Sequence, residues 1–136
     1  MKYLLDTNIC IALIRQKSAA VLQRLVSQKP GDVGISSITL AELVYSVEKS
    51  AQVEQNQAAL QQFILPLELA DFDQPAASAY GKIRVGLEGS GQVIGSMDML
   101  IAAHALSLDV TLVTNNVREF QRVNGLILED WISNDG

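Results

Sequence analysis

Four carboxylates stand beside apolar residues, where a charge is costly unless it has a partner. Asp6 directly follows the short apolar run Tyr3–Leu5, and Glu42 lies inside a mostly apolar segment. Asp98 immediately precedes an apolar segment, and Glu119 comes soon after another. A buried carboxylate requires a cation or strong hydrogen-bond donors close to it. These acids are therefore the first candidates for chemistry.

The chemistry that such acids perform depends on whether they come together. Several carboxylates in one place repel each other strongly unless a cation lies between them. Hard oxygen ligands suit Mg²⁺ or Mn²⁺, and Mg²⁺ commonly works on phosphates by activating water and stabilising the leaving oxygen. One His and one Cys cannot build an ordinary zinc site. A converging set therefore predicts metal-assisted hydrolysis of phosphodiester bonds.

Each acid taken alone also has an ordinary structural explanation. Asp6 fits a turn residue at the end of a strand, and Glu42 fits an ion pair with a Lys or Arg from elsewhere. Asp98 fits a helix N-cap, and Glu119 fits an exposed surface residue. The single residues leave these alternatives open, and only their combination favours a site.

The elements that must position these acids follow from the apolar pattern. Strands are predicted at residues 3–5, 33–36, 67–69, 111–114 and 126–128. Helices are predicted at 9–15, from Ser18, at 38 to about 49, at 52–64, from Asp73–Pro75, at 99–108 and briefly up to Phe120. This alternation predicts an α/β fold: a parallel sheet of about four to five strands, with helices on both faces. The helical run 37–64 predicts a helical hairpin beside the sheet, and the whole chain, 1–136, is expected to form one domain.

Local signals predict several helix boundaries and buried faces. Asn8 is the expected N-cap of the first helix, and Ser36 or Ser37 that of the third. The second helix has a predicted apolar face made of Val21, Leu22, Leu25 and Val26. The third helix is apolar on nearly all sides, which predicts deep burial. Trp131 is expected to anchor the C-terminal end of the chain.

The strand ends explain why distant acids would meet. The carboxyl ends of parallel strands point to one edge of a sheet, where open α/β sheets bind their ligands. Asp6 follows the first strand, and Thr114 ends a later one. Asn115–Asn116 and Glu119 come just after Thr114. We therefore expect these residues at the same edge as Asp6.

Charge and composition restrict the class of protein further. The net charge of −5 disfavours a passive DNA-binding module, which is usually basic. A nucleic-acid substrate would have to be held by a local basic patch or by metal ions. A single cysteine, Cys10, fits a reducing compartment. No apolar run approaches the ~20 residues that span a bilayer, and no signal peptide is evident, so we expect a cytoplasmic protein without membrane contact.

Other polar residues are weaker candidates. His104 lies roughly 240° around a helix from Asp98, which favours a packing or surface role over catalysis. Cys10 fits a small core residue. Arg84, and similarly Lys82 and Arg118, would contact RNA or a partner, or would simply be solvated or ion-paired.

An ordered set of motifs then matches a known family. The chain resembles the PIN-domain ribonucleases, and more closely the VapC toxins of bacterial VapBC type II toxin–antitoxin systems. The motifs that carry the resemblance are Leu5–Asn8, Ser36–Leu43, Gly95–Ala105, Val113–Phe120 and the closing Leu128–Trp131. Each motif is weak alone, and their common order along the whole chain is specific.

The resemblance implies a metal-dependent endoribonuclease with an acidic triad of Asp6, Glu42 and Asp98. It implies Asp6 and Asp98 as direct ligands of Mg²⁺, with Mn²⁺ as a substitute, and in-line attack by a metal-activated water. Many PIN domains have a fourth acid where this chain has Asn116. Close relatives also have a Glu at the position of Glu119, so the resemblance leaves open whether Glu119 or Asn116 takes the fourth role, and it places Asn116 and Thr114 in the shell around the metal or substrate. One tightly held Mg²⁺ is the expectation before RNA binds.

The resemblance also implies partners. These are a cognate VapB-type antitoxin that blocks the acidic pocket, an RNA substrate such as initiator tRNA, and a second copy of the chain in a homodimer. DNA would be contacted only through the antitoxin.

Three other functions compete with this hypothesis. A haloacid-dehalogenase-type phosphatase would need an Asp at Asn8, and a receiver domain would need a Lys at Asn115–Asn116, so both fit poorly. The third alternative is a degenerate PIN domain that acts as an interaction module, and its only support is the missing acid at Asn116.

Overall fold

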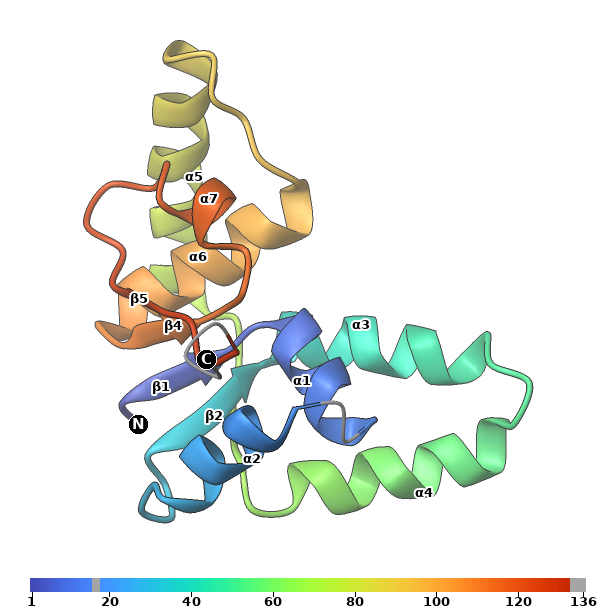
Figure 1. Ribbon diagram of the computed structural model, residues 1–136. Coiled ribbons are helices and arrows are strands. Elements are labelled where there is room, and N and C mark those ends of the chain that lie inside the picture. The colour runs from blue at the N-terminus through green and yellow to red at the C-terminus, as the bar shows by residue number, and fades with distance from the viewer. Residues whose placement is uncertain (16–17, 133–136) are drawn as a thin grey trace.

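The computed structural model describes residues 1–15 and 18–132, and within them five strands form one parallel sheet. The strand order is β3-β2-β1-β4-β5, so the first strand of the chain lies in the middle of the sheet (Figure 1). The strands are β1 (Tyr3–Leu5), β2 (Val33–Ser36), β3 (Glu68–Ala70), β4 (Thr111–Val113) and β5 (Leu128–Glu129). The prediction of an α/β fold with a parallel sheet is confirmed.

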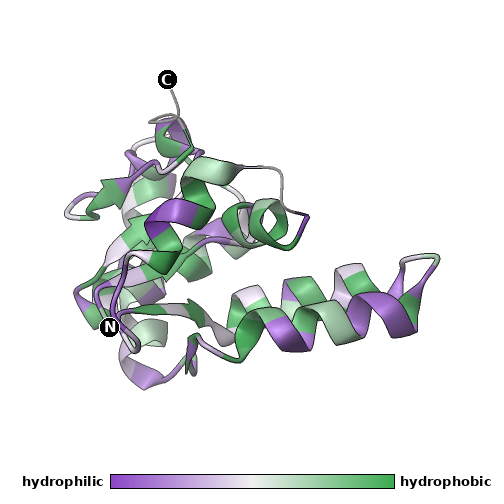
Figure 2. Ribbon diagram, turned by 60° about the horizontal axis from the view of Figure 1, so that its bottom comes forward, coloured by the Kyte–Doolittle hydropathy of each residue, from purple (hydrophilic) through white to green (hydrophobic). Residues whose placement is uncertain are grey.

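Seven helices surround the sheet in the described residues. They are α1 (Thr7–Ile14), α2 (Ala19–Val26), α3 (Ser37–Glu48), α4 (Val53–Ile64), α5 (Gln74–Gly89), α6 (Ser96–Leu108) and α7 (Val117–Phe120). Helices α3 and α4 form the predicted hairpin, which projects away from the sheet (Figures 1 and 2). It points in a different direction from α5 (Figure 1).

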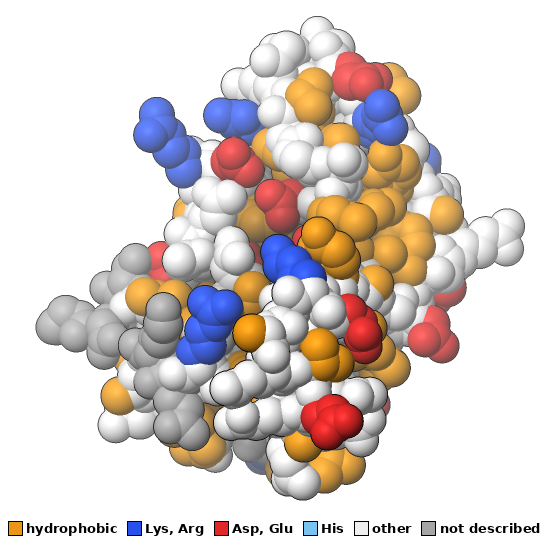
Figure 3. All heavy atoms as spheres, turned by 90° about the vertical axis from the view of Figure 1, so that its right-hand side faces the viewer, with side chains coloured by type: hydrophobic (Ala, Val, Ile, Leu, Met, Phe, Trp, Pro, Cys, Tyr) orange, Lys and Arg blue, Asp and Glu red, His pale blue; other side chains and the backbone are white. Residues whose placement is uncertain are grey.

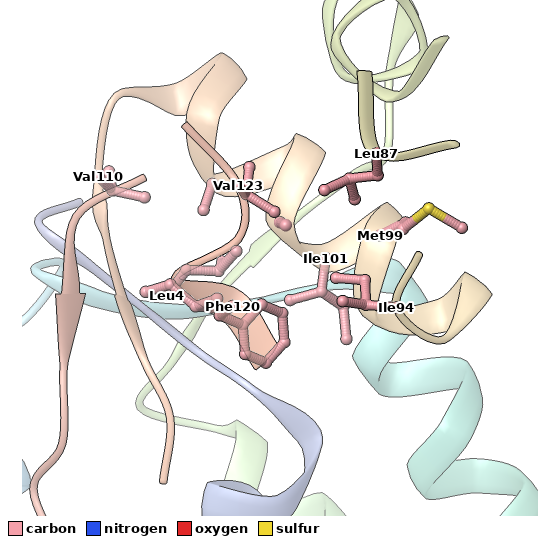
Figure 4. Close-up of a cluster of buried hydrophobic side chains, with 11 residues drawn as sticks. Leu4, Leu87, Ile94, Met99, Ile101, Val110, Phe120 and Val123 are labelled. Carbon is pink, nitrogen blue, oxygen red and sulfur yellow. The ribbon is translucent and has the colours of Figure 1, made fainter. Parts of the chain in front are cut away.

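The sheet separates two apolar cores, because successive side chains of a strand point to opposite faces. Leu4 and Leu112 belong to the core beneath α5, α6 and α7, whereas Leu5 and Val113 belong to the core beneath α1 to α4. Figure 4 shows the first of these cores, where Leu4 of β1 lies beside Phe120 of α7. Every one of these side chains is buried, so both faces of the short central strands are covered.

Side-chain caps fix where most helices begin. Ser18 Oγ accepts a hydrogen bond from Val21 N at 3.3 Å, and Ser36 Oγ accepts one from Ile38 N at 3.0 Å. Asp73 caps α5 in the same way, with Pro75 in the first turn. These three starts agree with the sequence signals, because Ser and Asp oxygens satisfy the free amides of a first turn.

Two helix starts differ from prediction, and both concern acids of interest. Asp6 caps α1, whereas Asn8 is an exposed residue of its first turn, because Asp6 alone separates the strand from the helix. Helix α6 begins at Ser96, so Asp98 lies in its first turn and is not the N-cap. The side chain of Asp98 is therefore not committed to capping.

Two helices are more exposed than predicted. Tyr45 and Val44 of α3 are 65% and 44% exposed, and only Thr39 and Leu43 are buried. Deep burial of α3 was wrong, because a helix in a projecting hairpin is covered on one side only. The predicted face of α2 is only partly confirmed: Val21 is buried and Leu25 packs against the core, whereas Leu22 and Val26 are exposed.

The C-terminal segment is tied to three elements. Trp131 is fully buried, its ring meets Tyr3 edge-on at 5.3 Å, and its Nε1 donates to Glu129 Oε1 at 3.0 Å. Arg24 of α2 lies over the ring, with Cζ 5.1 Å from the centroid, and also pairs with Glu129 at 2.8 Å. The predicted anchor is confirmed. The preceding strand, β5, starts at Leu128, two residues later than expected. Within the described residues, no helix combines the length and apolarity needed to cross a bilayer.

We expect Trp131→Ala to lower the free energy of unfolding by about 3–5 kcal/mol, because a large fully buried ring leaves a cavity. Urea denaturation followed by circular dichroism measures this loss. Leu65→Ala is the control, because Leu65 is 74% exposed and its truncation should change stability by less than about 0.5 kcal/mol. Equal midpoints for the two variants would contradict the anchoring role.

Candidate active site

Asp6 is a buried acid fixed by hydrogen bonds at the edge of the sheet. Only 4% of its surface is exposed, and its Oδ1 accepts a hydrogen bond from Ile9 N at 2.9 Å. The Thr114 side chain provides a second hydrogen bond to the carboxylate. Leu5 and Val113 are paired in the parallel ladder, so the residues that follow them, Asp6 and Thr114, leave the sheet side by side. The predicted meeting of these two strand ends is found.

The pKa of Asp6 is raised from 3.8 to about 6. Burial is the largest cause, because it penalises the charged carboxylate. The hydrogen bonds from Thr114 and Ile9 oppose this rise, while the negative charges of Asp98 and Glu42 add to it. A carboxylate perturbed by burial and by other acids is typical of functional sites.

Asp98 faces the other acids from the first turn of α6. Its pKa is raised by burial first, and then by the charges of Glu119 and Glu42. Glu42 therefore acts on both Asp6 and Asp98, and Glu119 acts on Asp98. Figure 3, seen from the outer end of the α3–α4 hairpin, shows acidic side chains close together with basic side chains on both sides. The structure thus brings the four predicted acids into one electrostatic group.

Glu42 is half-buried and is held by a hydroxyl group. Thr7 Oγ1 donates to Glu42 Oε1 at 2.6 Å and also lies 3.3 Å from Thr39 Oγ1. The alternative of an ion pair is not found, because the described salt bridges are Arg24–Glu129 and Arg84–Glu88.

Thr7 was missed by reasoning from the sequence. Its position directly after Asp6, in the first turn of a helix that packs on α3, was the available signal.

Glu119 is positioned by Asn116. Asn116 Nδ2 donates to Glu119 Oε2 at 3.1 Å, and the Asn116 backbone N donates to Thr114 Oγ1 at 2.9 Å. Thr114 is buried, while Asn116 and Glu119 are half-buried. The segment after β4 therefore supports Asp6 through Thr114 and directs the charge of Glu119 towards Asp98.

The donor set fits a hard divalent cation in its chemistry. All four acids offer oxygen ligands. Burial first, and then the charges of the neighbouring acids, raise the pKa values of Asp6 and Asp98, and a cation would offset both unfavourable effects. Among the described residues, however, no three Asp, Glu, His or Cys side chains are arranged to hold a metal ion. A site for Mg²⁺ does not need three such side chains, because Mg²⁺ is usually held by one or two carboxylates and keeps several of its water molecules.

Two cavities of the described residues lie away from the four acids. One, of about 140 Å³, is lined by residues of α1, α3 and α4, among them Ile14, Leu43 and Leu60. Another, of about 460 Å³, lies between α5, Leu106 and the segment at Arg122 to Asn124. Neither of these two cavities is lined by any of the four acids.

The weaker candidates have structural roles. His104 is fully buried, with its Nδ1 2.8 Å from Ser36 Oγ, so the packing alternative holds and the surface alternative is wrong. Burial lowers the pKa of His104, against the opposing effect of Asp73 and then of Asp71. Cys10 is a buried core residue, as predicted.

Arg84 is exposed and engaged within its own helix. Its Nε pairs with Glu88 Oε2 at 3.2 Å, and its Nη1 donates to Tyr80 OH at 2.8 Å. The ion-paired alternative therefore describes it. Lys82 and Arg118 are also exposed.

Comparison with known proteins places this geometry in a family. The model of the PIN domain matches residues 3–126. The chain is 45% identical over 131 residues to the tRNA(fMet)-specific endonuclease VapC of Shigella flexneri, which covers 96% of this chain and 98% of that protein. It is 46% identical over 132 residues to ribonuclease VapC2 of Rickettsia felis, with 96% and 98% covered. The chain belongs to the PIN-domain family, among the VapC ribonucleases.

Solved VapC structures agree with the fold. In the crystal structure of DNA-bound VapBC from Salmonella typhimurium, the matching chain superposes with a TM-score of 0.92 at 44% identity, and 96% of this chain and 98% of that one are covered. The VapBC2 complex from Rickettsia felis, bound to a fragment of its promoter, gives a TM-score of 0.88 at 45% identity, with 96% and 99% covered. PIN-domain nucleases generally depend on a divalent metal, in agreement with the oxygen-only donor set.

We expect Asp6→Asn to stabilise the metal-free protein near neutral pH. The folded state binds the Asp6 proton more tightly than the unfolded state, so ionisation above pH 6 costs stability, at most about 3 kcal/mol from the raised pKa. Asn caps a helix as well as Asp does and carries no charge. The variant should gain about 1–3 kcal/mol at pH 7.5, and this gain should vanish as the pH falls from about 6 to below 3.8.

Urea denaturation in EDTA across this pH range measures the difference between the two proteins. The control is Glu68→Gln at an exposed position of β3, which should show no such gain. A loss of stability in Asp6→Asn at pH 7.5 would mean that the buried charge is compensated in the folded protein.

Proposed function

We propose that this chain is the toxin of a type II toxin–antitoxin pair and a Mg²⁺-dependent endoribonuclease that cuts tRNA, with initiator tRNA as the first candidate. The observation that carries the proposal is the group of four interacting acids at the edge of the sheet, in a VapC-family chain. The named specificity of the Shigella flexneri relative supports the choice of tRNA.

The acids have different roles in this proposal, according to the contacts that hold each of them. Asp6, fixed by Ile9 N and Thr114, and Asp98, in the first turn of α6, would hold the Mg²⁺, and Mn²⁺ would use the same oxygens. A bound Mg²⁺ supplies activation of water and stabilisation of the leaving oxygen. Glu42, held by the Thr7 hydroxyl, orients a water molecule for in-line attack on the phosphorus.

The test is cleavage of end-labelled initiator tRNA in Mg²⁺, with and without EDTA. Asp98→Asn should lower the rate constant by more than about 100-fold, because changing even the outer partners of metal ligands costs about 10- to 100-fold. Asp109→Asn should cleave like the wild type, because Asp109 lies at the far end of α6. Unchanged cleavage by Asp98→Asn would remove the metal site from the mechanism.

The fourth acidic role belongs in this proposal to Glu119, because its charge acts on Asp98 and Asn116 orients it. Glu119→Gln should reduce cleavage by about 10- to 100-fold, and Asn116→Ala by about 10-fold or less, since it only frees Glu119 to move. Rates at several Mg²⁺ concentrations measure both variants. A greater loss in Asn116→Ala than in Glu119→Gln would assign the role to Asn116.

The second candidate function is a degenerate PIN domain that acts as an interaction module. The observation in its favour is the amide at Asn116, which adds no negative charge beside the acids. It predicts a wild-type protein that cuts no RNA in Mg²⁺ or Mn²⁺ and still binds its partner.

The proposed partner is a VapB-type antitoxin, through which alone the toxin would contact DNA. VapBC complexes with DNA are the solved structures of two relatives, which supports this arrangement. We also propose a homodimer, supported by the exposed apolar residues Val85, Val93 and Met97. The whole chain, 1–136, would act as one domain in the cytoplasm, where its tRNA substrate is found.

A further inference from the structure

Tyr45 is an exposed aromatic residue beside the acidic group. It is 65% exposed, while every other aromatic side chain of the described residues is buried or half-buried. Tyr3 and Trp131 pack on each other, and Phe120 lies in the core. An exposed ring with no packing role in the fold is available to a ligand.

The position of Tyr45 connects it with the site. It lies three residues after Glu42 on α3, so the two side chains share a face and are separated by roughly 4.5 Å along the helix axis. The Thr7 hydroxyl holds Glu42 at the acidic group. The ring of Tyr45 is therefore next to this group, on the solvent side.

A cation accompanies the ring. Lys49, one turn further along α3, places its Nζ 5.0 Å from the centroid of the Tyr45 ring. Lys49 is exposed, and neither described salt bridge includes it. In a chain with a net charge of −5, an exposed lysine beside an acidic group is well placed to attract the phosphates that the acids repel.

We propose that Tyr45 stacks on an unpaired RNA base next to the cut phosphate, and that Lys49 contacts a neighbouring phosphate. Proteins commonly bind single-stranded nucleic acid through aromatic side chains and nearby cations, because every base has a face that can stack on a ring and every nucleotide has a phosphate. The proposal rests on the ribonuclease function and adds to it a subsite for unpaired nucleotides, in which stacking provides affinity and does not take part in the reaction.

The first experiment measures kcat and KM for two RNA probes: a labelled single-stranded oligonucleotide and initiator tRNA. Tyr45→Ala should raise KM by about 5- to 100-fold, the equivalent of one lost stacking contact, with kcat within about threefold. Tyr45→Phe keeps the ring and should resemble the wild type. Lys49→Gln should raise KM and weaken its dependence on salt concentration.

The matched control is Val44→Ala, which also truncates an exposed apolar side chain of α3 but points away from Glu42. It should leave both kinetic constants unchanged. An unchanged KM in Tyr45→Ala overturns the proposal. A second outcome also overturns it: the purified cognate antitoxin inhibits Tyr45→Ala less strongly than the wild type, while KM for RNA stays the same. Tyr45 would then contact the antitoxin and not the RNA.

A second experiment detects the stacking itself. Tyr45→Trp in an Asp98→Asn background should lose fluorescence when the oligonucleotide binds, whereas Asp98→Asn alone, with only the buried Trp131, should not. This titration needs no cleavage. A wild-type protein that fails to cut RNA would contradict the proposed function, while quenching at position 45 would still support base contact and its absence would overturn it.

Discussion

The carboxylate of Asp6 is held by two elements at the point where β1 becomes α1, and the rest of the site depends on this arrangement. One hydrogen bond comes from the first turn of α1 and the other from Thr114, which follows β4. The parallel pairing of β1 with β4 fixes both donors relative to the acid. Burial of the same carboxylate then makes its charge costly. A fixed position and an unfavourable charge are together what a cation site requires, and the fold provides both before any ion binds.

The other acids are placed by two helices that meet through a buried contact. Ser36 caps α3, which carries Glu42, and shares a hydrogen bond with His104 of α6, which carries Asp98. The side chain of Phe72 meets the His104 ring edge-on at 5.4 Å, so the contact is well packed. Because both helices start at this edge, a shift of either start would move an acid relative to Asp6. The protein thus accepts repulsion among its acids, a cost to stability that functional sites commonly impose.

Features that depend on the spacing of apolar residues and on the order of the strands can be predicted from the sequence. Contacts between side chains that are far apart in the sequence cannot. The strand at Tyr3–Leu5 and the strand before Thr114 follow from short apolar runs, and parallel pairing then predicts that Asp6 and Thr114 are neighbours. The contact of Thr7 with Glu42 joins residues 35 apart, and no local pattern encodes it. Asn8 was mistaken for a cap because Asp6 was assigned to the strand end alone. Burial of α3 was overestimated because composition does not reveal that a hairpin projects from the sheet.

The strand order has a consequence for how the protein is made. β1 is synthesised before its neighbour β4, which lies more than a hundred residues later in the chain, so these two strands can pair only after β4 has left the ribosome. Asp6 lacks Thr114 until then, and Asp98 and Glu119 also arrive late. Pairings between residues far apart in sequence form slowly. A nascent chain therefore has no acidic site, which gives a ribonuclease a built-in delay before it can reach the RNA of the machinery that is producing it.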